Sequence, residues 1–208
     1  MQNVKSVKRN IGQKVITITI KNIWKHFRKI QTHRKWVRYY CFKCGIPWQG
    51  IKHDLSKYSP TEFFESVKYY QGTSSPINAA KADKGYSDAW FHHKGRNKHH
   101  YEYWMDNFDN GGQNIIMPFK YWVELICDYL GASRAYNGDD FSYYKEFKWW
   151  EEKSKHCAMN PALIKATTAV FEALMRQENA YYLDFYYHPD KLLSKAWLKQ
   201  HYDKYVNL

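Results

Sequence analysis

Apolar residues recur at helical spacing along most of the chain, and sustained alternation is confined to residues 15–20. Side chains three and four positions apart lie on one face of a helix, whereas strand side chains alternate between two faces. The clearest helical stretches cover residues 23–44, which are followed by Gly45, and the segment that follows Pro118. The pattern predicts an all-α fold with roughly 60% or more of the chain in helices, well above the usual share.

Several helix starts carry capping signals. Ser59 precedes Pro60 and lies three residues before Glu62, which predicts a helix that ends near Tyr70. The segment 71–87 is rich in Gly, Ser and Pro and is expected to be a surface loop with one short helix. Further helices are expected after Ser87, after Asn97, after Pro118, after Asn160-Pro161 and from Leu192 to Tyr205.

The length of 208 residues fits one domain or one domain with an appendage. We divide the chain into a basic N-terminal segment (1–22), a helical core (23–138) and C-terminal helices (139–208) that pack on the same domain. The run VITITI is too short to cross a bilayer, so the sequence predicts neither a signal peptide nor a membrane anchor. We therefore expect a cytoplasmic protein.

The four cysteines do not form a zinc motif. Cys41 and Cys44 are two residues apart, but Cys127 and Cys157 supply no second pair at matching spacing. We therefore expect them to be free, mostly buried thiols in a reducing compartment.

Lysine and arginine outnumber aspartate and glutamate by 32 to 20, which gives a formal net charge of +12. Such a surface attracts nucleic acid, nucleotides, other phosphorylated small molecules or anionic lipid. The alternative is that excess lysine only keeps the protein in solution, because the basic residues are spread along the whole chain.

The histidines offer the most specific chemistry. Six of the ten lie between residues 33 and 100, and four of these form the adjacent pairs His92-His93 and His99-His100. His53 is followed directly by Asp54. Neutral imidazole and carboxylate together suit divalent ions such as Fe, Mn, Co, Ni, Zn or Mg. A coincidental grouping is the alternative, since a single His-Asp pair is common.

The order His33, His53-Asp54, Asp128 on predicted helices resembles the HD-domain superfamily of metal-dependent phosphohydrolases. The resemblance implies an HD-like helical bundle with additional C-terminal helices, in which these four residues hold one metal ion. HDLSK also looks like the HDIGK form of the superfamily motif, in which the lysine, here Lys57, meets substrate phosphate. Ser56 stands where that form has glycine.

Superfamily members with more than one ion carry further histidines between the two aspartates. The resemblance therefore implies a second ion bound by residues from the two histidine pairs. We favour His93 and His100 as its ligands over His92 and His99, although spacing does not decide between them.

The run from about residue 33 to 136 is also similar to a family of uncharacterised phage and bacterial proteins. The similarity rests on the segments GIPWQGIKHDLSKYSPTEF, KGYSDAWFHHKGRNKHHYEYW and CDYLGAS. It implies no established activity.

The leading hypothesis is a metal-dependent phosphohydrolase with one or two divalent ions, acting on a nucleotide or another phosphorylated small molecule. Asp54 and Lys57 would be catalytic, and Lys57 and Arg96 would bind phosphate, although Arg96 is equally readily a solvated loop cation. The alternatives are an HD-type di-iron oxygenase, and a nucleic-acid-binding or phage-host interaction protein whose metal site is structural.

Overall fold

The computed structural model describes residues 19–106, 108–181 and 188–206, and this part of the chain is predominantly helical, as predicted. Its helices and strands are α1 (Ile20–Lys43), α2 (Pro47–Lys52), α3 (Pro60–Lys68), α4 (Pro76–Lys84), α5 (Asp88–Arg96), β1 (Met105–Asp106), β2 (Gln113–Asn114), α6 (Phe119–Asn137), α7 (Tyr143–Ser154), α8 (Pro161–Tyr181) and α9 (Lys195–Val206). Short 3₁₀ turns follow α2 (η1, Leu55–Tyr58) and precede β1 (η2, Tyr101–Trp104).

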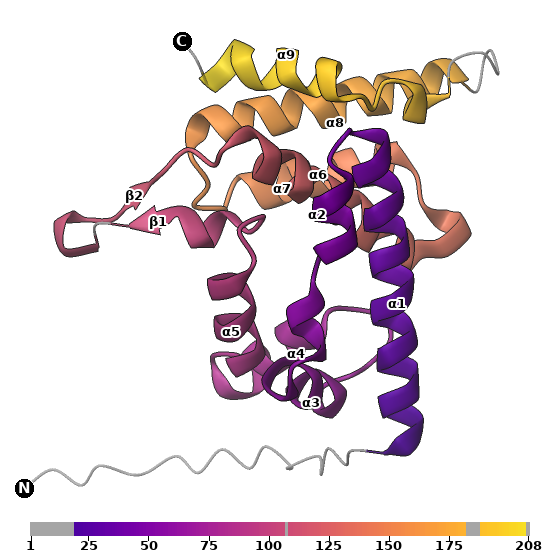
Figure 1. Ribbon diagram of the computed structural model, residues 1–208, viewed down its shortest axis with the longest axis vertical. Coiled ribbons are helices and arrows are strands. Elements are labelled where there is room, and N and C mark those ends of the chain that lie inside the picture. The colour runs from indigo at the N-terminus through magenta and orange to yellow at the C-terminus, as the bar shows by residue number, and fades with distance from the viewer. Residues whose placement is uncertain (1–18, 107, 182–187, 207–208) are drawn as a thin grey trace, which may run out of the picture.

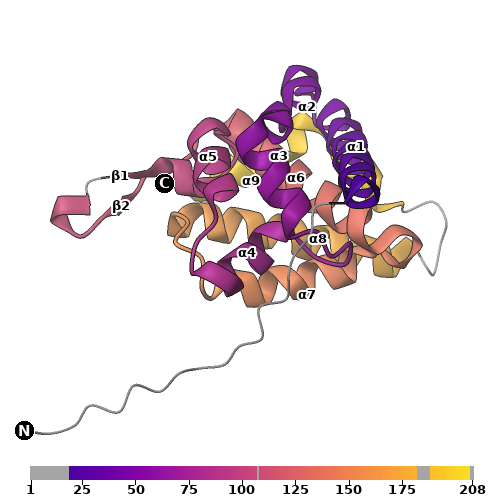
Figure 2. The ribbon, with the colours of Figure 1, turned by 90° about the horizontal axis from the view of Figure 1, so that it is seen from below.

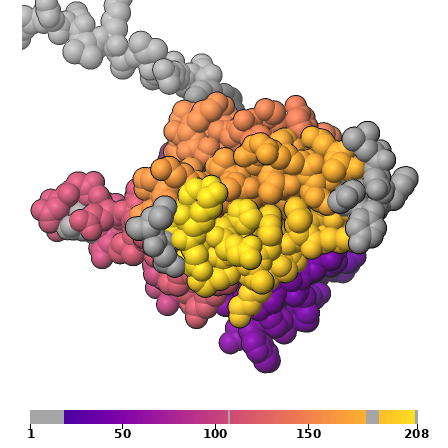
Figure 3. All heavy atoms as spheres, turned by 90° about the horizontal axis from the view of Figure 1, so that it is seen from above, coloured from indigo at the N-terminus to yellow at the C-terminus, as the bar shows by residue number. Residues whose placement is uncertain are grey.

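Helices α8 and α9 lie together across one end of the molecule, while α3 and α4 lie at the opposite end (Figure 1). Figure 3 shows α8 and α9 side by side on that outer face. The β1–β2 hairpin projects from the helical body in both ribbon views (Figures 1 and 2). None of the described helices has the length and apolar character needed to span a membrane.

The hydrophobic core is built by α1 and α6 to α9. Its largest fully buried side chains include Tyr40 of α1, Trp122 of α6, Trp150 of α7 and Phe171 of α8. Within the described residues, no member of α3, α4 or α5 belongs to this core. The C-terminal helices therefore share one core with α1 and α6.

Helices α1 and α6 approach so closely that one position has no room for a side chain. A Cβ atom added to Gly131 would lie 2.5 Å from Cγ2 and 2.9 Å from the backbone nitrogen of Val37. Gly131 lies inside α6, which continues to Asn137. The glycine thus serves helix packing and does not end the helix.

The predicted starts of α3 and α5 are confirmed. The hydroxyl of Ser59 accepts the backbone N–H of Glu62, and that of Ser87 accepts the N–H of Trp90. The helix expected after Asn97 does not form. Instead, the Asn97 side-chain amide donates to the carbonyl of His93, and Asn97 itself is extended, so this residue closes α5. A turn follows, in which the backbone N–H of His100 donates to the carbonyl of Asn97, and it leads into η2.

Two elements were not predicted: the hairpin at 105–114 and helix α7. Most of the N-terminal segment, including the alternating residues up to 18, lies outside the described residues. The longest predicted helix, from Asn160-Pro161, is described up to Tyr181, and the next described residue is His188.

Candidate metal centre

Four separate parts of the chain bring histidine and carboxylate side chains to one buried point. His33 comes from α1, the pair His53-Asp54 from the junction of α2 and η1, and Asp128 from α6. His93 comes from the last turn of α5, and His99 and His100 from the connection that follows it. All of these residues are buried except His100, which is partly buried.

The His53-Asp54 pair lies between helical elements, which corrects the expectation that every ligand lies on a helix. Asp54 has φ 55° and ψ 27°, in the left-handed region, and is the sole non-glycine residue with positive φ in the described chain. Such a conformation costs free energy for residues with a Cβ atom, and aspartate is among those that tolerate it best. This turn directs the Asp54 carboxylate inward, where its exposed fraction is 1%.

The first group consists of His33, His53, Asp54 and Asp128, whose ligand atoms meet closely. Nε2 of His33 lies 3.1 Å from Oδ2 of Asp54 and 3.1 Å from Oδ1 of Asp128. Nε2 of His53 lies 3.3 Å from Oδ2 of Asp54 and 3.2 Å from Oδ1 of Asp128. The two imidazole nitrogens are themselves 3.3 Å apart.

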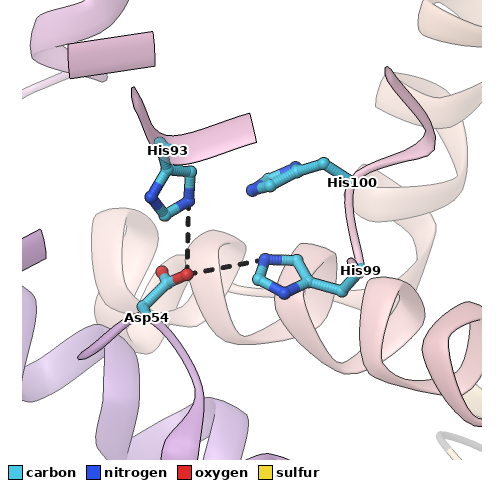
Figure 4. Close-up of side chains that lie close together, drawn as sticks. All are labelled: Asp54, His93, His99 and His100. Atoms are coloured by element: carbon cyan, nitrogen blue, oxygen red, sulfur yellow. Dashed lines mark ion pairs between the residues drawn. The ribbon is translucent and has the colours of Figure 1, made fainter. Parts of the chain in front are cut away.

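The second group consists of Asp54, His93, His99 and His100. Nε2 of His93 lies 3.2 Å and Nε2 of His99 lies 3.5 Å from Oδ1 of Asp54, the contacts drawn in Figure 4. The ring of His100 faces the same space, with its centroid 4.2 Å from that of His99 and 4.8 Å from that of His93. Asp54 therefore belongs to both groups, with one carboxylate oxygen directed at each.

Two further buried carboxylates contact the Nδ1 atoms of the histidines, on the side of each ligand ring away from Asp54. Oε1 of Glu124 lies 3.0 Å from Nδ1 of His53 and 3.2 Å from Nδ1 of His99. The two oxygens of Glu62 take Nδ1 of His92 at 2.6 Å and Nδ1 of His93 at 2.7 Å. A proton on each Nδ1 leaves Nε2 free, and this is the arrangement by which proteins orient metal-binding imidazoles.

The charges of the site favour cations. Burial alone would raise the pKa of Asp54, but the charges of His53, Lys57 and His93 hold it well below its usual value. Burial likewise opposes ionisation of Asp128, yet hydrogen bonds from His33 and His53 keep its pKa well below normal. When the imidazoles are neutral, the site contains four buried carboxylates and one ammonium, that of Lys57, so three negative charges are left uncompensated. The carboxylates are those of Asp54, Glu62, Glu124 and Asp128.

The donor set fits divalent metal ions. Ligand atoms about 2.0–2.2 Å from one ion are separated by roughly 3.0–3.4 Å, which matches the spacing within the first group. In the described chain, Oδ1 of Asp54 and Nε2 of His99 and His100 are buried without a hydrogen-bond partner. Buried polar atoms without partners are costly, and coordination would satisfy all three.

A cavity of about 200 Å³ opens beside the two groups. His33, His93, His100 and Asp128 contribute to its wall, together with Lys57. The ammonium of Lys57 lies 2.6 Å from Oδ2 of Asp54, and its side chain is 28% exposed. A ligand in this cavity would therefore meet both the cluster and a fixed cation.

Two of the predicted residues lie apart from this arrangement. Arg96 lines a different cavity, of about 360 Å³, which reaches the cluster at His99 and Glu124. Lys57 and Arg96 thus do not face one ligand from the same cavity. His92 belongs to neither group and is held by Glu62.

Sequence reasoning ranked His99 below His93 and His100, but the structure brings all three to Asp54. It did not identify Glu124, although Glu124 lies four residues before Asp128 and so shares its helix face. It assigned Glu62 to capping or the surface, whereas its side chain is 3% exposed and binds two histidines.

Comparison with known proteins gives one match. Neither a curated protein nor a solved structure matches the chain. A protein-family profile matches residues 22–177, a range that contains every residue of both groups. The chain belongs to that family, which is described as a family of unknown function, DUF5662.

Proposed function

We propose that this protein is a metal-dependent phosphohydrolase with a centre that would hold two ions, Asp54 being among the residues available to each. The observation that carries the proposal is the division of the Asp54 carboxylate between two buried groups of ligands. Oδ2 faces His33 and His53, while Oδ1 faces His93 and His99. Two adjacent ions form a clamp suited to the attacking and leaving oxygens of a phosphate ester. The resemblance to the HD-domain superfamily supports the same function.

In this proposal, His33, His53, Asp54 and Asp128 hold the first ion, and Asp54, His93, His99 and His100 hold the second. Bound ions would lower the pKa of a water molecule and neutralise phosphate charge. Glu124 and Glu62 keep the imidazoles oriented. Lys57 supplies a fixed positive charge at the wall of the cavity, where a phosphate oxygen would bind.

The experiment measures metal content and phosphate release together. Purified protein is stripped with chelator, titrated with Fe²⁺, Mn²⁺, Co²⁺, Ni²⁺ and Zn²⁺, and assayed anaerobically on a panel of nucleotides and other phosphate esters. We expect two bound ions, at least one substrate that releases phosphate, and loss of both metal and activity in His53→Ala. Lys57→Met should retain metal and lose activity.

His156→Ala is the matched control, because the His156 side chain is 77% exposed and belongs to neither ligand group. It should bind metal like the wild type. Equal metal content in His53→Ala and wild type would show that the site is assigned wrongly. Metal binding without phosphate release, accompanied by oxygen uptake and a mixed-valent EPR signal, would instead establish the di-iron oxygenase.

The net charge of +12 leaves a nucleic-acid-binding protein with a structural metal site as a further hypothesis. Affinity for unrelated DNAs that falls steeply with salt, without phosphate release, would favour it.

All four cysteines are free thiols, which supports the proposal that the protein acts in the cytoplasm.

A further inference from the structure

Another cavity, here termed the second cavity and distinct from the one lined by Arg96, adjoins the cavity at the candidate metal centre. It measures about 390 Å³, and the two cavities have Ser75, Ala132 and Tyr136 in common as wall residues. The cavity at the cluster is smaller than the roughly 300–1,000 Å³ of typical small-molecule sites, whereas the two together fall within that range. A ligand with one end at the cluster would therefore extend into the second cavity.

Helix α6 connects the two spaces. Asp128 of the first group, Ala132 and Tyr136 follow one another at intervals of four residues, so they lie along one face of the helix. With a rise of about 1.5 Å per residue, the second cavity lies on the order of 6–12 Å from the Asp128 position. That distance separates one end of a small substrate from the other.

The second cavity is lined by aromatic rings and contains one buried acid. Tyr129, Tyr136 and Trp149 contribute to its wall, and the rings of Tyr129 and Trp149 are 5.1 Å apart. Glu146 of α7 also lines it and is 3% exposed. Oε1 of Glu146 is buried with no hydrogen-bond partner within the described chain.

The state of Glu146 agrees with a role in binding an uncharged group. Burial raises its pKa to about 8, against the opposing effect of a hydrogen bond from Ser133 and with a further increase from the charge of Asp128. A protonated carboxyl both donates and accepts hydrogen bonds. Ser133 partners one side of this carboxyl, and leaving the other oxygen, Oε1, without a partner in the interior is costly.

We propose that this second cavity binds the planar heterocycle of a phosphorylated substrate, and that Glu146 hydrogen-bonds the edge of that ring. The inference rests on the proposed function, because the phosphate of the same molecule lies at the metal centre beside Lys57. Planar heterocycles stack on aromatic side chains, and their edges carry the donors and acceptors that a carboxyl recognises. The substrate class is accordingly a nucleotide or a similar phosphorylated heterocycle, and Glu146 is its specificity-determining residue.

The test compares binding of inorganic phosphate with binding of adenosine, guanosine, cytidine and uridine monophosphates by calorimetry. Full-length protein is used, loaded with the ion that it binds most tightly. We expect at least one nucleotide to bind the wild type ten-fold or more tightly than phosphate does. Glu146→Met, which keeps the length of the side chain but removes its donor and acceptor, should weaken that nucleotide by about ten-fold or more and leave phosphate affinity unchanged.

Two further variants keep the test decisive. Trp149→Leu removes a ring that is 44% exposed, so it preserves folding and should also weaken the nucleotide but not phosphate. Glu151→Gln, an exposed change on the same helix, should alter neither ligand.

The outcomes separate the two proposals. If phosphate binds but no nucleotide binds better, or if Glu146→Met and Trp149→Leu bind the nucleotide like the wild type, the second cavity is not a heterocycle site and the proposed function stands. If neither phosphate nor any nucleotide binds the loaded protein, both proposals fall.

Discussion

Neutralising the carboxylate of Glu124 should weaken metal binding without unfolding the protein. Oε1 of Glu124 accepts from Nδ1 of both His53 and His99, one histidine from each group. In Glu124→Gln a neutral amide oxygen replaces the charged acceptor of both hydrogen bonds, and we expect this to weaken each bond by about 1 kcal/mol. The combined loss of about 2 kcal/mol corresponds to a roughly 30-fold weaker affinity, within the range of about 10–100-fold seen for outer partners of metal ligands.

Glu62→Gln is the matched comparison. Of its two histidine partners, His93 alone belongs to a ligand group, while His92 does not. One weakened bond predicts a loss of about 1 kcal/mol, or roughly five-fold, confined to the second ion.

Competition titration of the stripped protein against a fluorescent chelator, fitted with two sites, measures both affinities. Glu172→Gln, an exposed change on α8, should behave like the wild type. Unchanged affinity in Glu124→Gln, or a larger loss in Glu62→Gln than in Glu124→Gln, would refute the assignment of these carboxylates as supports of metal ligands.

Two other predictions concern pH and packing. Burial would lower the pKa of His53 and His93, but Asp54 and the neighbouring carboxylates raise both above 6.5, so each proton must leave before an ion binds. Metal affinity should therefore rise with pH above about 6.5, with protons released into a weak buffer, and a flat profile would contradict this. The same shift stabilises the metal-free fold below that pH, and the contribution is lost as pH rises through the raised pKa. In thermal unfolding, Gly131→Ala should lower the free energy of unfolding by about 2–3 kcal/mol, because the new methyl group meets Val37. Gly95→Ala should raise it by about 0.5–1 kcal/mol, because the Cβ atom there meets nothing within 4 Å. Equal effects of the two changes would refute the close approach of α1 and α6.

Much of the fold follows from local signals in the sequence. Helical spacing predicts the all-α class, and the serine caps at Ser59 and Ser87 fix two helix starts, because each cap is a contact between residues three apart. The hairpin escapes such reasoning, since its paired strands have two residues each and show no alternation. Helix α7 also escapes it, because Glu146 interrupts its otherwise apolar buried face.

The candidate site was predictable in its ligand types but not in its full arrangement. The order of His33, His53, Asp54 and Asp128 resembles that of the HD-domain superfamily, and this resemblance predicted that the four residues would lie together. The role of Glu124 depends on contacts with His53 and His99, which come from parts of the chain far from it in sequence, and no local pattern encodes this. For His99 and His100, the turn that follows Asn97 brings both rings to Asp54, and the side chain of Asn97 contacts α5 and Ser56.

The absence of α3, α4 and α5 from the hydrophobic core has a consequence for how the molecule responds to its surroundings. Apolar packing joins α1 to α6–α9, whereas the α3–α5 portion contacts α1 and α6 through rings such as His26 and Phe63 and through Asp54 and His93 of the candidate metal centre. An ion bound there, as we propose, would hold these two parts of the polypeptide together and could be removed by a chelator. The supply of metal in the cell would then govern how tightly the smaller part closes, and amide hydrogen exchange would register this in α3–α5 before it did in α8.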